Sequence, residues 1–184
     1  VDMLDQLGIN NTYCIAVPQS IADQYGLETS SDLIPVAGEL RFGAEHEFFT
    51  EEGTMKYTPF TQFYGLNFKE KIPVDINLKY AAVENGNFDV TVVYTTDGLN
   101  RKANLKVLED DQNFFPEYNG ALLVREGLYD ELADAAPNLK DILNSLSGTL
   151  TNEKMTDLTY AVDVEGRTVE EVAREFLTES GLIG

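Results

Sequence analysis

Three tyrosines stand where an α/β chain tends to line a cleft. Tyr94 ends the clearest strand in the sequence, Tyr13 begins the strand that enters the α/β unit, and Tyr118 precedes the strand that leaves it. Ligands of open α/β sheets bind outside the carboxyl ends of strands. Electron-rich ring faces in a dry pocket attract a cation without N–H groups, each contributing on the order of 2 kcal/mol. The alternative interpretation is core packing with a solvated hydroxyl.

His46 and Cys14 are the only residues of their types. Glu45 and Glu47 flank His46, so these three side chains could ligate a metal for a metal-dependent enzyme, but a surface or hinge histidine is the simpler interpretation. A single histidine and a single cysteine exclude HExxH helices, multi-cysteine zinc sites and internal disulfides. Cys14 lies in the middle of a predicted strand, where a buried, inert thiol is expected.

Other motifs that carry chemistry are missing from the sequence. There is no Gly-x-Ser-x-Gly elbow, P-loop or Gly-x-Gly-x-x-Gly run. The acidic run Glu109-Asp110-Asp111 lacks the alternating ligands and the glycine of an EF-hand, so we interpret it as a solvated loop. We therefore predict a protein without catalytic residues, metal or cofactor, and not an enzyme.

Net charge narrows the classes of partner. The 184 residues include 32 acidic and 13 basic ones, which gives a formal charge of −19 and a pI near 4.2. Such a field repels phosphate, so nucleic acid and anionic membrane surfaces are poor partners. Cationic small molecules remain compatible with it.

The first half of the chain alternates strand-like and helical runs. Strands are predicted over residues 12–17, 40–43, 71–74 and 89–94. Helices are predicted over 20–25 and 59–64, each followed by glycine, and from Asp75, as N-cap, to about Asn85. This alternation predicts an α/β fold with a mostly parallel sheet and right-handed crossovers.

The second half is predicted to be mostly helical after a strand at 121–124. A helix is expected from Pro137 to a stop at Gly148. Thr168 and Glu171 form a capping-box pair ahead of an amphipathic helix. The apolar stripe of that helix needs a partner surface, and few strands in this half can supply one.

Seven short strings, in order and at family-like spacing, resemble the substrate-binding proteins of osmoprotectant ABC importers, the glycine betaine/carnitine/choline family. The resemblance runs from about Leu7 to Gly181. The strings are Asn10-Asn11-Thr12-Tyr13, Leu40-Arg41-Phe42-Gly43-Ala44-Glu45, Asp75-Ile76-Asn77-Leu78-Lys79-Tyr80, Thr95-Thr96-Asp97-Gly98, Phe114-Phe115-Pro116-Glu117-Tyr118-Asn119, Val124-Arg125-Glu126 and Val162-Asp163-Val164-Glu165-Gly166.

The resemblance implies a type II periplasmic-binding-protein-like fold that closes on its ligand. Family members hold a quaternary ammonium group in a cage of four tyrosines. By motif, three of them are here Tyr13, Tyr94 and Tyr118. Asn11 is expected to reach the other end of the ligand, and Thr95 and Asp97, in the turn after Tyr94, are further candidates for the cleft.

Family members begin with a segment that supplies the main strands of the first lobe and the fourth cage tyrosine, and the resemblance implies that this segment is absent here. Residues 1–10 are then the remnant of lobe 1 before the hinge. Residues 11–111 are the complete second lobe, and residues 112–184 are the hinge return and the helical C-terminal part of lobe 1. Self-association of such a chain is an expectation that follows from its exposed apolar surface.

The expected function is that of a solute receptor. It captures glycine betaine, carnitine or choline and delivers it to an ABC transporter permease. The expected location is the extracellular face of the membrane, lipid-anchored or fused to the permease, or the periplasm. Two alternatives stay open: an ergothioneine-binding receptor of the same family, and an acidic interaction or sensor module that has lost ligand binding.

Overall fold

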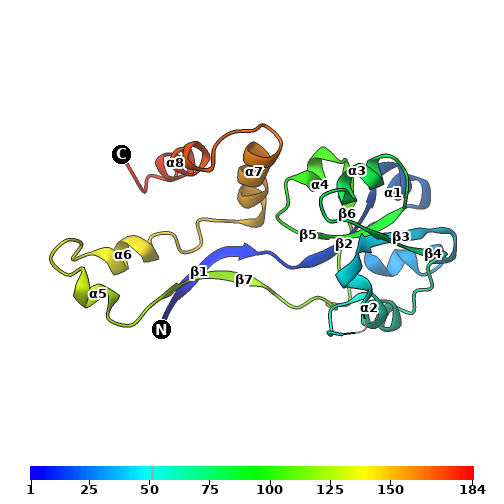
Figure 1. Cartoon of the computed structure of the whole chain (residues 1–184), viewed down its shortest axis with the longest axis horizontal. Coiled ribbons are helices and arrows are strands. Elements are labelled where there is room, and N and C mark those ends of the chain that lie inside the picture. The colour runs from blue at the N-terminus through cyan, green and yellow to red at the C-terminus, as the bar shows by residue number, and fades with distance from the viewer. Residues whose placement is uncertain (51) are drawn as a thin grey trace.

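The computed structural model describes residues 1–50 and 52–184, and shows an elongated molecule in which a two-stranded ribbon leads away from a five-stranded sheet (Figure 1). The strands of the sheet are, in spatial order, β4 (Glu70–Val74), β3 (Arg41–Glu45), β5 (Val90–Tyr94), β2 (Tyr13–Pro18) and β6 (Leu105–Val107). Strand β3 is parallel to β4 and β5, whereas β2 is antiparallel to β5 and β6. Four strands share one direction, as the predicted α/β alternation requires, and β2 alone is reversed.

The reversal of β2 follows from where the chain enters the sheet. The crossover rule fixes the direction of strands that are joined through a helix. Strand β2 comes first and arrives from the ribbon at the edge where β5 ends, with Tyr13 directly opposite Tyr94. It therefore runs away from that edge while β5 runs toward it.

The helices of this part of the chain lie on both faces of the sheet (Figure 1). They are α1 (Gln19–Tyr25), α2 (Tyr57–Tyr64), α3 (Lys79–Glu84) and α4 (Leu99–Lys102), with 3-10 turns η1 (Ser30–Leu33), η2 (Ala37–Glu39) and η3 (His46–Phe49). Helices α1 and α2 end, as predicted, at left-handed Gly26 and Gly65. Helix α3 starts later than predicted, because the Asp75 carboxylate accepts the Asn77 N–H at 2.8 Å in a local turn and caps no helix.

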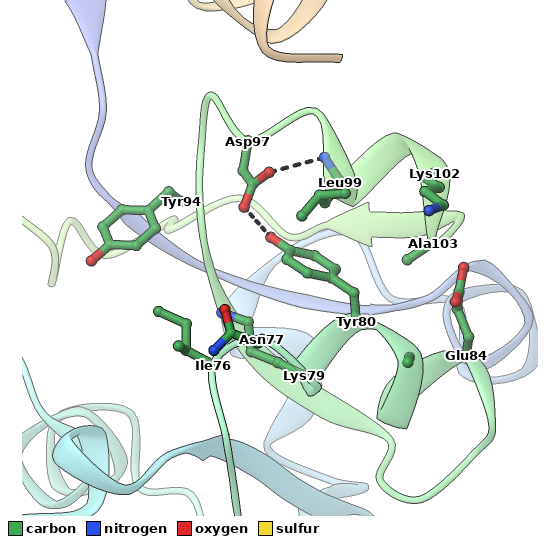
Figure 2. A pocket seen from close by; sticks show the side chains of 11 residues that line it. Ile76, Asn77, Lys79, Tyr80, Glu84, Tyr94, Asp97, Leu99, Lys102 and Ala103 are labelled. Atoms are coloured by element: carbon green, nitrogen blue, oxygen red, sulfur yellow. Dashed lines mark hydrogen bonds between the residues drawn. The ribbon is translucent and has the colours of Figure 1, made fainter. Parts of the chain in front are cut away.

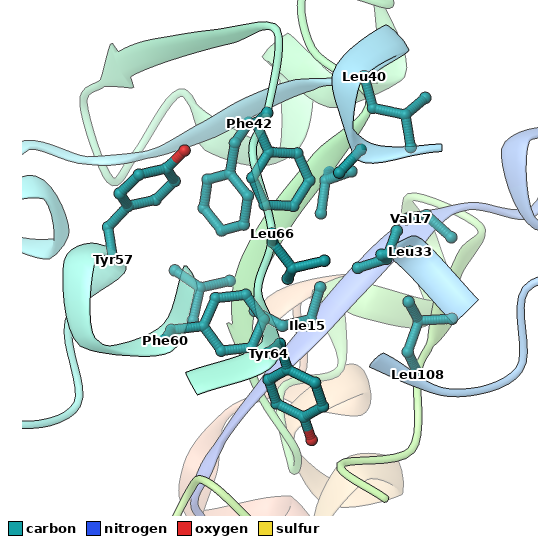
Figure 3. Close-up of a cluster of buried hydrophobic side chains, with 14 of the residues drawn as sticks. Ile15, Val17, Leu33, Leu40, Phe42, Tyr57, Phe60, Tyr64, Leu66 and Leu108 are labelled. Atoms are coloured by element: carbon teal, nitrogen blue, oxygen red, sulfur yellow. The ribbon is translucent and has the colours of Figure 1, made fainter. Parts of the chain in front are cut away.

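The main core lies between the sheet and the layer of α1 and α2 (Figure 3). Side chains alternate along β2, so that Ile15 and Val17 enter this core while Cys14 and Ala16 face Tyr80 on the other side. The aromatic centre of the main core is Phe42. Its ring lies 5.9, 5.1 and 5.0 Å, between centroids, from the rings of Phe48, Tyr57 and Phe68. We call residues 13–115 the sheet lobe, because Phe115 is the last residue of this core.

A buried ion pair and one glycine fix α3 and the neighbouring strands. The Lys79 ammonium donates to the Glu45 carboxylate at 2.6 Å and to the Val92 carbonyl at 3.0 Å. Helix α3 is thereby tied to the end of β3 and to the middle of β5. A Cβ on Gly43 would stand 2.2 Å from the Phe88 ring, so this position in β3 requires glycine.

The ribbon consists of β1 (Asp2–Asn10) and β7 (Asn119–Val124), which pair antiparallel from Asp2↔Val124 to Asn10↔Asn119. The predicted strand at 121–124 is confirmed. Strand β1 was not predicted, because its acidic and glycine residues carry little β-propensity, and its extended form comes from pairing with β7. The ribbon connects the sheet lobe to the helical remainder of the chain (Figure 1).

Residues 125–184, the returning segment, are helical as predicted. Their helices are α5 (Leu128–Glu131), α6 (Leu139–Asn144), α7 (Asn152–Asp163) and α8 (Val169–Glu179). The predicted helix at Pro137 is shorter than expected and begins at Leu139. The capping box of Thr168 and Glu171 is confirmed, and Val172 and Phe176 of the apolar stripe are buried. No helix in the described part of the chain is both long and apolar enough to cross a bilayer.

Candidate ligand-binding site

Tyr13 and Tyr94 form an aromatic stack where the chain enters the sheet. The antiparallel register of β2 and β5 puts them directly opposite each other. Their ring centroids are 4.8 Å apart, the ring planes are inclined by 29°, and the Tyr94 hydroxyl donates to the Tyr13 hydroxyl at 3.2 Å. Tyr94 is the last residue of β5 and Tyr13 is the first residue of β2. The pair therefore lies where these two inner strands end, and not in the middle of the sheet.

A pocket of about 240 Å³ opens beside this stack. Its lining residues are Asn11, Thr12, Tyr13, Met55, Tyr94 and Tyr118. The segments before β2 and before β7 are joined at this point, since the Asn11 N–H donates to the Tyr118 carbonyl at 3.0 Å and the Asn10 amide oxygen accepts the Tyr118 N–H at 2.6 Å. Tyr94 is 38% exposed and Tyr118 is 68% exposed, so the pocket is open to solvent.

Two aromatic rings of the main core pack against Tyr13. The Phe48 and Phe115 rings meet it edge to face, with centroids 6.0 and 6.1 Å away. Burial, the hydrogen bond with Tyr94 and the negative charge of Glu45 raise the pKa of Tyr13 above its ordinary value. The phenol therefore stays neutral at physiological pH, and an attraction for cations must come from the ring faces rather than from a phenolate.

Asn11 is oriented by the turn that follows Tyr94. Its amide oxygen accepts a hydrogen bond from the Thr96 hydroxyl at 2.8 Å. The amide NH₂ of Asn11 has no hydrogen-bond partner among the described residues, so it is the group that this side chain offers to the polar end of a ligand.

Thr95 and Asp97 do not line this pocket. The Thr95 hydroxyl donates to the Asn10 carbonyl at 2.7 Å, which ties the turn after β5 to the last residue of β1. Asp97 faces a second cavity, of about 400 Å³, beside α3 and α4. There its carboxylate accepts the Tyr80 hydroxyl and the Leu99 N–H (Figure 2). Both residues shape the turn that carries Tyr94, and their contact with a ligand stays a prediction.

The structure does not assemble the alternative site around His46. His46 and Glu47 are exposed, and Glu45 is engaged with Lys79. Across residues 1–50 and 52–184, no three metal-ligating side chains lie close enough together to hold an ion.

The interpretation of Glu109-Asp110-Asp111 as a solvated loop holds for the exposed Glu109 and Asp111, whereas Asp110 is partly buried. The Asp110 carboxylate accepts the Tyr64 hydroxyl and, at 2.7 Å, the Phe115 N–H. Asp111 accepts the Ser31 N–H at 3.1 Å. The Asp110 carboxylate anchors the segment that leads to Tyr118, because it is the acceptor for two partly buried donors of that region.

Cys14 is expected to resist alkylation in the folded protein. Its thiol is buried, and this burial raises the pKa of Cys14 to about 12, so almost no reactive thiolate forms at mildly alkaline pH. Mass spectrometry after iodoacetamide treatment, with the chain in denaturant as the control, measures this. Equal rates of labelling with and without denaturant would contradict it.

Three residues at the pocket were not predicted. Met55 enters from the irregular segment before α2, where no periodicity marks an inward position. Thr12 and Asn10 stand in the string Asn10-Asn11-Thr12-Tyr13, and their closeness to two recognised residues was the only available signal. Thr12 also donates its hydroxyl to the Pro116 carbonyl at 2.7 Å, two residues before Tyr118.

Comparison with known proteins gives the family. Residues 1–179 match the model of the substrate binding domain of ABC-type glycine betaine transport systems. The chain belongs to this family. Members of the glycine betaine substrate-binding family are transport binding proteins and not enzymes, as the sequence analysis predicted.

Two curated proteins and one solved structure illustrate the similarity of this chain to the family. A carnitine transport binding protein of Listeria monocytogenes is 37% identical over 96% of the chain and 56% of that protein. An ergothioneine transport permease/ergothioneine binding protein of Helicobacter pylori is 36% identical over 96% of the chain and 31% of that protein. A crystal structure of a glycine betaine/carnitine/choline ABC transporter is 34% identical, with a TM-score of 0.82, over 98% of the chain and 64% of that chain.

These comparisons fix the fold and the extent of the match. The neighbours share the type II periplasmic-binding-protein fold, which confirms the predicted fold class. The chain spans about half the length of the Listeria relative and about a third of the Helicobacter relative.

Proposed function

We propose that the chain captures a quaternary ammonium solute, such as glycine betaine, carnitine or choline, for an ABC importer. The observation that carries this proposal is the Tyr13–Tyr94 stack, which forms one pocket with Tyr118 and Asn11. A methylated ammonium has no N–H to donate and is recognised by aromatic faces, and three tyrosines line this small pocket. The net charge of −19 favours a cation over an anion.

The stack defines where the cation can sit. Ring centroids 4.8 Å apart are in direct contact, so no methylated ammonium fits between Tyr13 and Tyr94. The cation instead approaches from the side that opens toward Met55 and Tyr118, within roughly 6 Å of the ring centroids. Tyr13 and Tyr94 act as one wall and Tyr118 as another. Asn11 meets the polar end of the solute, while Thr95 and Asp97 support the turn behind Tyr94.

The remaining parts of the proposal rest on family resemblance. Residues 1–10 and 112–184 contribute to one lobe, and residues 11–111 form the other, against whose core Phe114 and Phe115 of the hinge return pack. A fourth aromatic wall belongs to the part of longer relatives that this chain does not match. The closed form docks on the permease at the extracellular or periplasmic face of the membrane, with the chain lipid-anchored or fused to the permease. Self-association through exposed apolar surface is a further part of this proposal.

Ergothioneine is the second candidate ligand, favoured by the Helicobacter pylori relative at 36% identity. It carries the same trimethylated ammonium as carnitine and glycine betaine, so aromatic walls alone do not separate these solutes. The groups that face the other end of the solute decide among them, and Asn11 is one of these.

Calorimetric titration tests the proposed function. In a chimera, the part of the Listeria protein that this chain does not match is placed before Val1. The 184-residue chain and the chimera are each titrated with glycine betaine, carnitine, choline and ergothioneine. We expect one of these solutes to bind the chimera at least tenfold more tightly than the chain alone, because the added part carries the fourth aromatic wall of the proposal.

Two matched ligands control the titration. Glycine differs from glycine betaine only in its N-methyl groups, and the neutral analogue of choline replaces trimethylammonium by a tert-butyl group of the same shape. Neither is expected to bind. The ammonium of glycine would lose its hydrogen bonds to water against the ring faces, and the tert-butyl analogue has no charge for those faces to attract. If none of the four solutes binds either protein, the proposal is overturned and an interaction or sensor module is favoured instead.

A further inference from the structure

Helix α7 of the returning segment contacts the turn that carries Tyr94. The Thr159 hydroxyl accepts the Gly98 N–H at 3.0 Å. Its hydrogen lies within reach of the Thr96 carbonyl at 2.9 Å and of the Thr156 carbonyl of its own helix at 3.1 Å. One hydroxyl from outside the sheet lobe therefore joins two backbone groups of the 95–98 turn.

The contact is close because Gly98 has no side chain. A Cβ on Gly98 would stand 2.4 Å from the backbone nitrogen of Tyr160, a distance that no real Cβ contact shows. Gly98 does not have a positive φ. Glycine is therefore needed here to let the helix backbone approach the turn, and not to allow an unusual backbone conformation. The turn and the helix are therefore shaped for direct backbone contact.

Helix α7 is also attached to the segment that precedes Tyr13. At its first residue, the Asn152 amide oxygen accepts the Asn10 N–H at 2.7 Å. Asn10 in turn holds Tyr118 through its side chain and Thr95 through its carbonyl. Beyond the turn, the Arg101 guanidinium pairs with Asp157 at 2.8 Å. The helix thus bonds to the segments that precede Tyr13 and follow Tyr94, and it reaches Tyr118 through Asn10.

We propose that Thr159 is a positioning residue of the aromatic pocket. It fixes the 95–98 turn and, through that turn, the angle at which Tyr94 meets Tyr13. The consequence is that the placement of α7 and the geometry of the ring stack change together. The ligand side of this inference rests on the proposed function, whereas the ring geometry is measurable without any ligand.

The test compares Thr159→Val, which keeps the shape but removes the hydroxyl, with Thr159→Ser, which keeps the hydroxyl. Amide exchange of Gly98 and the ring resonances of Tyr94 are read by NMR on the ligand-free chain. We expect Thr159→Val to speed Gly98 exchange about fivefold, the effect of one lost hydrogen bond, and to shift the Tyr94 ring signals. Thr159→Ser should match the original chain in both.

Thr178→Val is the matched control, because the exposed Thr178 hydroxyl bonds only within α8, to the Arg174 carbonyl at 2.9 Å. It should leave Gly98 and Tyr94 unchanged. Unchanged Tyr94 signals in Thr159→Val, with or without faster Gly98 exchange, would overturn the inference. If Tyr94 responds while glycine betaine, carnitine, choline and ergothioneine all fail to bind the original chain and the chimera, the proposed function fails and the positioning role stands.

Discussion

Leucine in place of Tyr94 is expected to weaken binding of the methylated ammonium solute by about 30-fold, which corresponds to about 2 kcal/mol of cation–π attraction. Phenylalanine at the same position should keep most of the affinity, because the ring face survives and only the hydroxyl that donates to Tyr13 is lost. Titration of both variants, in the chimera and with whichever solute binds the original protein, measures the difference.

Tyr25→Leu is the control for this pair of variants. Tyr25 ends α1, and its hydroxyl donates to Glu39, away from the pocket lining. It should leave the affinity unchanged. Equal losses for Tyr94→Leu and Tyr94→Phe would show that the hydroxyl, and not the ring, makes the contact with the solute, and would contradict the cage proposal.

Alanine in place of Phe42 is expected to lower the free energy of unfolding by about 3–5 kcal/mol. The Phe42 side chain is 0% exposed and packs against Phe48, Tyr57 and Phe68, so its loss leaves a cavity that β3 and α2 cannot close. Since the total free energy of unfolding of a small domain is only about 5–15 kcal/mol, this change removes a large fraction of the stability. Urea unfolding followed by circular dichroism measures it.

Phe63→Ala serves as the comparison within the same protein. Phe63 is 50% exposed and touches Tyr64 and Phe114 at the edge of the same aromatic cluster. Half its surface already faces water, so we expect the free energy of unfolding to fall by about 1 kcal/mol. Similar losses in the two variants would show that Phe42 does not occupy the centre of the core.

The sequence predicted most elements of the sheet lobe because their ends carry strong local signals. Gly26 and Gly65 terminate α1 and α2 in left-handed conformations, as glycine after a helix predicts. Asp75 misled the prediction, since an aspartate serves a helix N-cap and an Asx turn through the same side-chain oxygen. Local sequence does not tell these two uses apart.

The pairing of Tyr13 with Tyr94 shows how a site prediction depends on strand direction. The alternation of elements predicted parallel strands, and in parallel neighbours the start of one strand and the end of the other lie at opposite edges of the sheet. The two rings meet because β2 alone is reversed. The strand-end positions and the family resemblance pointed to the tyrosines, whereas the reversal was visible only in the fold.

Contacts between distant parts of the chain were beyond prediction. Asn10 and Asn152 are separated by 142 positions, and nothing in either local string indicates the hydrogen bond that joins them. Strand β1 and the attachment of α7 to the 95–98 turn are of the same kind, since both depend on tertiary packing rather than on propensity.

The hydrogen bond between the Asn11 N–H and the Tyr118 carbonyl, at 3.0 Å, has a topological consequence. The chain enters and leaves the sheet lobe through adjacent points, so the lobe is an insertion carried by a host whose two halves, β1 and β7, pair without it. Chain ends that lie this close are what make domain insertion and circular permutation tolerable. The host and its insert can therefore exchange sequence by recombination at a single pair of junctions, with Tyr13 and Tyr94 carried on the insert and Tyr118 at its exit.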